Sequence, residues 1–219
     1  CWELMAVGST LVLWAGGNAG AFAASRRYVA IHLLGGVILF AGVAGHLLDT
    51  GDATFTRMAP DSVAHWLILI GFLINAGAPP LSAWLPDAYP EASWSGSVFL
   101  SAFTTKTAVY VLLRGFPGTE FLIWIGIFMI FYGIVYALLE NDMRRILAYS
   151  IVNQVGFMIA GIGIGTEMAL NGAAAHAFSH IVYKALLLMS AGAVLAATGR
   201  RKCSELGGLF HSMPITTIC

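Results

Sequence analysis

Seven apolar stretches, separated by short polar links, limit what this chain can fold into more than any other feature. Each is close to the roughly 20 residues that a helix needs to cross a bilayer. They cover about residues 2–24, 28–48, 64–83, 93–113, 119–139, 145–165 and 170–198. Hydrophobic residues make up 58% of the sequence and charged residues only 10%, too few for the polar coat of a soluble domain. The sequence therefore predicts an all-α, polytopic transmembrane helix bundle with about seven spanning helices, forming one domain over residues 1–219.

The charge and cysteine content exclude several classes of function. The formal net charge is zero, which argues against a nucleic-acid partner. Cys1, Cys203 and Cys219 are far apart and favour neither a disulfide framework nor a metal site, and no cofactor is predicted. The opening apolar run lacks the basic region of a signal peptide. Because the chain starts with Cys and ends in "SMPITTIC", which resembles the start of another apolar segment, we expect a fragment of a longer membrane protein.

The basic residues in the links indicate an orientation. Successive helices alternate in direction, so alternate links share one side of the membrane. One side holds seven basic residues and the other holds two, which are Arg57 and Arg114. Cytoplasmic loops are enriched in Lys and Arg, so the first side is predicted to be cytoplasmic, in a prokaryotic inner membrane. Its seven residues are Arg26, Arg27, Arg144, Arg145, Arg200, Arg201 and Lys202.

Two lysines fall inside apolar stretches instead of in links. Lys106 and Lys184 each lie near the middle of a stretch. A lysine at the bilayer centre costs roughly 2.5–3.5 kcal/mol on insertion scales, so such residues usually have a function. Burial also disfavours the charged form of a lysine, which makes it able to exchange protons. The alternative is that each lysine is structural and either snorkels to the interface or pairs with an acid, but only Glu3 among the acids lies in an apolar run.

Polar side chains cluster around both lysines. His176, His180 and Lys184 are four residues apart and therefore share one helix face, with Tyr183 on its flank. In "SAFTTKTAVY", Lys106 is surrounded by hydroxyl groups that could hold water, among them Thr105 and Tyr110. This pattern is typical of a proton relay, although each histidine alone would more often be an ordinary interhelical polar contact.

The third stretch contains a predicted interruption of its helix. In "INAGAPPLSAWLPDAYPEA", Pro79 and Pro80 remove two backbone donors. A helix broken at membrane depth is tolerated only inside protein or beside water, and broken helices mark ion sites in transporters. The alternative is that the prolines simply end the helix.

Several motifs together resemble one family. These are "PPLSAWLPDAYPEA", "SAFTTKTAVYVLLRG", "DMRRILAYSIVNQVGFM", "HAFSHIVYKALLLMSAG" and "ELGGL". In this order they are similar to the antiporter-like membrane subunits, which include Mrp-type cation/proton antiporter subunits and the proton-pumping subunits of respiratory complex I and membrane hydrogenases. The likeness covers essentially the whole chain and is greatest to the D-type member of the Mrp antiporter subunits.

The resemblance implies a larger fold and a set of site residues. Family members have about fourteen helices with inverted repeats, and this chain resembles the fifth to the eleventh. Glu3 then corresponds to the glutamate of helix five and Lys106 to the lysine of helix eight. Lys184 with His180 corresponds to the relay of helix eleven. The family's lysine on helix seven is absent, because Asn75 occupies its place, and this puts proton entry and pumping in doubt.

Three functions remain open at this stage. In the first, the chain is part of a proton-conducting subunit of a multisubunit Na+/H+ antiporter and works with other membrane subunits, protons, Na+ and the lipid bilayer. In the second, the same relay serves NADH-quinone oxidoreductase or a membrane-bound hydrogenase. In the third, the chain is a non-transporting scaffold or sensor bundle with structural lysines. Neighbouring genes would separate the first two.

Overall fold

The computed structural model describes residues 2–218, which are almost entirely helical. Seven long helices follow one another along the chain, with short helical pieces after the third and the last of them. The long helices are α1 (Trp2–Trp14), α2 (Ala19–Thr50), α3 (Val63–Ala76), α5 (Trp94–Gly115), α6 (Phe121–Leu139), α7 (Met143–Ile164) and α8 (Glu167–Thr198). The short pieces are α4 (Trp84–Ala88), η1 (Tyr89–Glu91), η2 (Cys203–Glu205), α9 (Leu209–Ser212) and α10 (Pro214–Ile218).

The predicted all-α membrane helix bundle is confirmed. Five helices, α2, α5, α6, α7 and α8, are long and apolar enough to cross a bilayer. The helices α1 and α3 are also apolar but contain only 13 and 14 residues, so two of the seven helices are shorter than predicted.

The predicted boundary between the first two helices is wrong. The sequence placed a link at Arg26 and Arg27, but α1 already ends at Trp14 and α2 begins at Ala19. Gly17 adopts a positive φ of 70°, which glycine tolerates, and the Asn18 side chain accepts a hydrogen bond from the backbone of Ala21 as an N-cap. Both arginines therefore belong to α2.

The third predicted stretch ends earlier than expected. It was placed at residues 64–83, whereas α3 stops at Ala76 because Gly77 takes up the left-handed conformation with φ 78°. Residues 77–83, which include Pro79 and Pro80, are not helical, and the chain becomes helical again in α4. The indole N–H of Trp84 donates to the Ile74 carbonyl at 3.1 Å and so ties α4 back to the end of α3. The predicted interruption is thus present, but it begins before the prolines.

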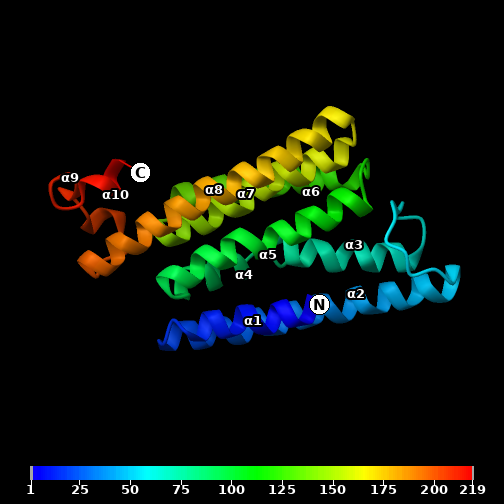
Figure 1. Ribbon diagram of the computed structural model, residues 1–219, viewed down its shortest axis with the longest axis horizontal. Coiled ribbons are helices and arrows are strands. Elements are labelled where there is room, and N and C mark those ends of the chain that lie inside the picture. The colour runs from blue at the N-terminus through cyan, green and yellow to red at the C-terminus, as the bar shows by residue number, and fades with distance from the viewer. Residues whose placement is uncertain (1, 219) are drawn as a thin grey trace.

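The helices form layers around α5. Figure 1 shows α1 and α2 on one side, α6, α7 and α8 on the other, and α5 between them. The helix α5 packs against α3 on one side and against α8 and α7 on the other. This central position makes α5 the element that can connect the two halves of the bundle.

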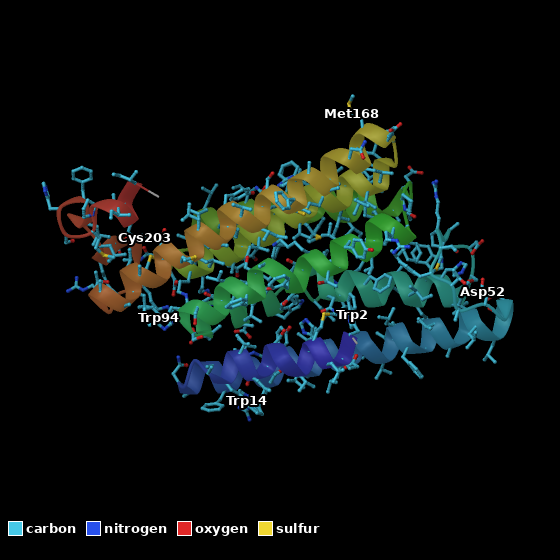
Figure 2. All side chains as sticks on the ribbon, viewed as in Figure 1. Trp2, Trp14, Asp52, Trp94, Met168 and Cys203 are labelled. Atoms are coloured by element: carbon cyan, nitrogen blue, oxygen red, sulfur yellow. The ribbon has the colours of Figure 1, made fainter. Side chains whose placement is uncertain are left out.

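The links gather at two opposite ends of the bundle. At one end, Arg201 forms ion pairs with Glu91 at 3.0 Å and Asp142 at 2.7 Å. The buried Arg144 donates to the Ala92 carbonyl at 2.9 Å, just after η1. At the other end, Arg57 donates to the Pro117 carbonyl at 2.9 Å. Figure 2 shows the same separation, with Trp14, Trp94 and Cys203 towards one end and Asp52 and Met168 towards the other. The basic residues Arg144 and Arg201, assigned to one side of the membrane, therefore do share one end.

Candidate functional site

The two intramembrane lysines are both buried in the bundle. Lys106 on α5 is 6% exposed and Lys184 on α8 is 2% exposed. Each lies well inside its helix, far from both helix ends. Their predicted location in the interior is therefore confirmed, and neither side chain faces the lipid.

Lys106 is held by oxygen atoms of its own helix. Its Nζ donates to the Ser101 carbonyl at 2.9 Å and to Thr105 Oγ1 at 3.2 Å. Thr105, a predicted neighbour, is fully buried beside it. Tyr110, another predicted neighbour, instead lies 54% exposed and accepts a hydrogen bond from Arg114. The structure thus places Thr105 at the lysine and Tyr110 away from it.

Lys184 reaches across to α7. Its Nζ donates to Ser150 Oγ at 2.9 Å. Within residues 2–218, neither Lys184 nor Lys106 forms an ion pair with a carboxylate. Ammonium groups that are structural in an apolar interior are normally paired with an acid, so these two lack the usual structural partner.

His180 lies between the lysines in the interior. It is fully buried, and neither of its ring nitrogens has a hydrogen-bond partner among the described residues. The structure brings it close enough to Lys106 and Lys184 for their charges to interact. An imidazole can accept a proton on one nitrogen and release one from the other, so this position is chemically suited to passing a proton.

A chain of polar side chains continues from this cluster along α7 and α8. Gln154 Oε1 accepts hydrogen bonds from His176 Nε2 at 2.8 Å and from the Tyr183 hydroxyl at 3.2 Å. Gln154 Nε2 donates in turn to Asn153 Oδ1 at 2.9 Å. His176 and Tyr183 were predicted, whereas sequence reasoning missed the three α7 residues. Their signal was a polar stripe at helical spacing in an otherwise apolar helix, formed by Ser150, Asn153 and Gln154.

Glu3 and Asn75 lie outside this cluster and apart from each other. Glu3 is exposed on α1, beside Gly36 of α2. Asn75 is buried in the last turn of α3, where its Oδ1 atom has no partner within residues 2–218. The structure therefore brings Lys106, Thr105, His180 and Lys184 together, but it does not place the predicted Glu3 or Asn75 with them.

A further titratable cluster lies at the end of the bundle opposite to Arg201. His65 Nε2 is 3.0 Å from His46 Nδ1, and His65 Nδ1 donates to Asp61 Oδ1 at 2.7 Å. This hydrogen bond from His65 holds the pKa of Asp61 below its usual range. Among the described residues, no three His, Cys, Asp or Glu side chains are grouped as a metal site requires.

Comparison with known proteins gives the same family from the sequence and from the fold. The family model described as "NADH:quinone oxidoreductase/Mrp antiporter, TM" matches residues 1–219. The D-type member of the Na(+)/H(+) antiporter subunits of Alkalihalophilus pseudofirmus is 30% identical over 97% of this chain and 47% of its own length. The M-type member of the NADH-quinone oxidoreductase subunits of Pseudomonas aeruginosa is 31% identical over the same shares, 97% and 47%.

Two solved structures have the same helical arrangement. A chain of the Mrp complex from Dietzia sp. DQ12-45-1b superposes with a TM-score of 0.89 at 27% identity, over 99% of this chain and 44% of that chain. A chain of an archaeal membrane-bound sulfane sulfur reductase gives a TM-score of 0.90 at 26% identity, over 99% and 48%.

The sequence thus spans about half the length of these relatives. The match of the family model over the whole chain, together with this shared fold, establishes that the chain belongs to the NADH:quinone oxidoreductase/Mrp antiporter transmembrane family.

Proposed function

We propose that this chain forms part of a proton-conducting membrane subunit of a multisubunit monovalent cation/proton antiporter. The observation that carries the proposal is the pair of buried ammonium groups, Lys106 and Lys184, that have no carboxylate partner among the described residues and flank a buried histidine with two unoccupied ring nitrogens. The similarity to a Na(+)/H(+) antiporter subunit and to a chain of the Mrp complex supports the antiporter context.

The relay runs along α5, α8 and α7. Lys106 gives up a proton to His180, which passes one to Lys184 from its other ring nitrogen. Lys184 then exchanges it with the hydroxyl and amide groups that begin at Ser150. The membrane potential supplies about 2.3 kcal/mol per charge per 100 mV, which is comparable to the cost of placing one ammonium group in the bilayer. Modest driving energies therefore suffice to shift the charge between these residues.

The partners and orientation follow from the same context. The subunit would work with other membrane subunits in the lipid bilayer and would exchange Na+ for protons. The end of the bundle that carries Arg144, Arg201 and Lys202 would face the cytoplasm of a prokaryotic cell, because cytoplasmic ends are rich in basic residues.

A second candidate function is a proton-pumping subunit of a redox-driven complex. It is favoured by the similarity to the NADH-quinone oxidoreductase subunit and to the sulfane sulfur reductase chain. The same lysines would conduct protons, but electron transfer in other subunits would drive them. Proton flux that requires Na+ supports the antiporter, whereas flux that requires an electron donor supports the redox complex.

The proposal is tested by replacing Lys106 with alanine in the full-length subunit within its assembled complex. Cation-driven proton flux into vesicles is expected to fall at least tenfold, because the α5 half of the relay is lost. Lys202→Ala is the matched control, since Lys202 is exposed and pairs only with Glu205 at 3.7 Å among the described residues. Co-purification of the partner subunits checks assembly. Normal flux in an assembled Lys106→Ala complex would refute the proposal and favour a scaffold or sensor role.

A further inference from the structure

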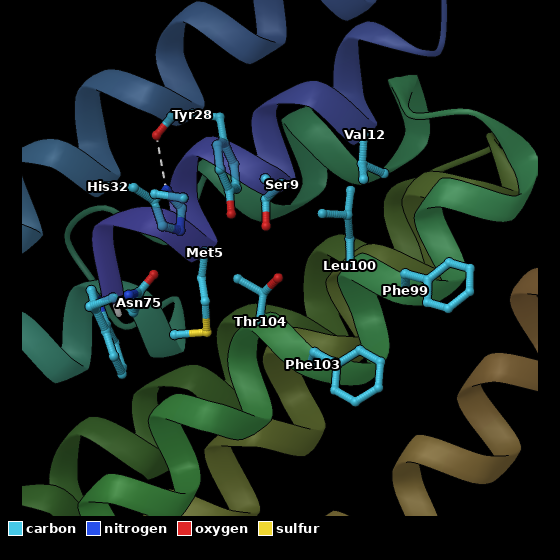
Figure 3. Close-up of a pocket in the computed structure, with 13 residues that line it drawn as sticks. Met5, Ser9, Val12, Tyr28, His32, Asn75, Phe99, Leu100, Phe103 and Thr104 are labelled. Carbon is cyan, nitrogen blue, oxygen red and sulfur yellow. Dashed lines mark hydrogen bonds between the residues drawn. The ribbon is translucent and has the colours of Figure 1, made fainter.

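A second polar site lies on the other side of α5 from the lysine cluster. A cavity of about 240 Å³ opens between α1, α2, α3 and α5, with mainly apolar walls. Its polar lining consists of Ser9, Tyr28, His32, Asn75 and Thr104. Figure 3 shows these side chains facing one another across the cavity, while the rings of Phe99 and Phe103 point away. Thr104 lines this cavity and the next residue, Thr105, contacts Lys106, so α5 separates the two sites.

Three polar atoms in this cavity lack a hydrogen-bond partner within residues 2–218. They are the Tyr28 hydroxyl, His32 Nε2 and Asn75 Oδ1. Their side chains belong to residues that are 1%, 2% and 8% exposed, respectively. A buried polar group without a partner costs about 1–3 kcal/mol, and three such groups around one cavity call for a common ligand.

The hydrogen bonds around His32 define what that ligand must offer. His32 Nδ1 is 2.9 Å from the Tyr28 carbonyl, which can only accept, so Nδ1 carries the hydrogen. Nε2 of the neutral ring is then an acceptor, as is Asn75 Oδ1. The nearby indole N–H of Trp84 is already donated to Ile74 and cannot serve them. The missing ligand must therefore be a small donor, and the cavity has room for several water molecules.

We propose that this cavity is a hydrated proton site in which His32 takes up a proton from water held by Tyr28 and Asn75. An O–H bond of a hydronium breaks, the proton bonds to the Nε2 lone pair, and a neutral water remains; release reverses the step. The inference rests on the proposed proton-conducting function and adds a second station to it. The ligand is water and the proton, so no metal or organic cofactor is needed here.

The surroundings can accommodate a charged imidazole. The His32 ring stacks on the Tyr28 ring at a centroid distance of 3.8 Å and meets the Trp84 ring edge-on at 4.5 Å. Aromatic rings beside a cation stabilise it by about 0.5–2 kcal/mol. Apart from His32, the titratable group in the cavity lining is Tyr28, also from α2; the lining side chains of α1, α3 and α5 are neutral. The proton on His32 would thus meet no fixed charge among the lining residues.

The water site is tested first, without any transport assay. Hydroxyl radicals generated from bound water by X-rays label neighbouring side chains, so in the full-length complex Tyr28 is expected to be labelled in spite of its burial. Tyr89 is the control, because it is equally buried but its hydroxyl is satisfied by the Leu100 carbonyl at 2.9 Å. Labelling of Tyr28 no stronger than that of Tyr89 would overturn the proposal.

The proton step is tested with His32→Phe and His32→Gln, against His46→Phe as control. Both His32 variants are expected to lower proton flux at least fivefold in assembled complexes, whereas the His46 variant keeps it. The glutamine variant preserves polarity and covers the case in which the phenylalanine variant fails to assemble. Wild-type flux in an assembled His32→Gln complex would overturn the proton role. Flux that survives Lys106→Ala would instead remove the proposed relay, while Tyr28 labelling would still decide the water site.

Discussion

At the scale of single residues, Lys184 allows function and stability to be separated. It is an ammonium group that is 2% exposed and donates a hydrogen bond to Ser150. Methionine has a similar length and no desolvation cost, and the freed Ser150 hydroxyl can bond to a carbonyl of its own helix. Lys184→Met is therefore expected to raise the unfolding temperature and to abolish proton flux. Thermal unfolding in detergent and vesicle flux measure the two effects; a stabilised variant with full flux would make Lys184 structural.

The same residues show which parts of the site can be predicted from sequence. Lys106 and Lys184 are visible because a charge within an apolar run is rare and expensive. Ser150 and Gln154 are not, since neutral polar residues are common in helices and their role depends on which face of α7 meets α8. His32 falls in the same class, because an unpartnered atom is a property of the assembled interior.

At the scale of elements, the close contact of α6 with α7 is the clearest packing constraint. A Cβ atom added at Gly126 would lie 2.6 Å from both the Ala160 nitrogen and the Gly156 carbonyl oxygen, which belong to the backbone and cannot move aside. We expect Gly126→Ala to destabilise the protein by about 1–3 kcal/mol, because the two helices must separate.

Gly172 on α8 provides the matched control. A Cβ atom there would meet nothing within 4 Å. The same substitution is expected to stabilise α8 by about 0.5–1 kcal/mol, because alanine loses less backbone entropy than glycine in a helix. Thermal unfolding of the two variants in one detergent compares them, and equal shifts in the same direction would contradict this account of the α6–α7 contact.

Element boundaries were less predictable than element existence. The apolar run from α1 continues without a break into α2, so the conspicuous Arg26 and Arg27 suggested a link that the chain does not make. The turn is instead specified by Gly17 and the N-cap Asn18, whose signals are local and easily masked by hydropathy. Likewise, α3 ends at Ala76, before the more obvious prolines.

At the scale of the whole molecule, the two ends differ in charge and in chemistry. One end holds Arg144 and Arg201, joined to the helices by carbonyl contacts and ion pairs. The other holds the cluster of His46, His65 and Asp61. The alternation of links predicted this division of the basic residues between the ends, because it depends on the number of helices and not on where each one ends.

This polarity predicts the orientation in the membrane. Cys203 is exposed at the basic end, so a membrane-impermeant maleimide should label it in inside-out vesicles and not in right-side-out ones. Cys1 and Cys219 are first replaced by serine in the full-length protein, so that the signal comes from one thiol. Thr54→Cys in a variant that also lacks Cys203 places a thiol at the opposite, exposed end and should give the reverse pattern. Labelling of Cys203 from the outside would invert the orientation, and the relay from Lys106 to Lys184 would then carry protons in a membrane frame opposite to the one proposed.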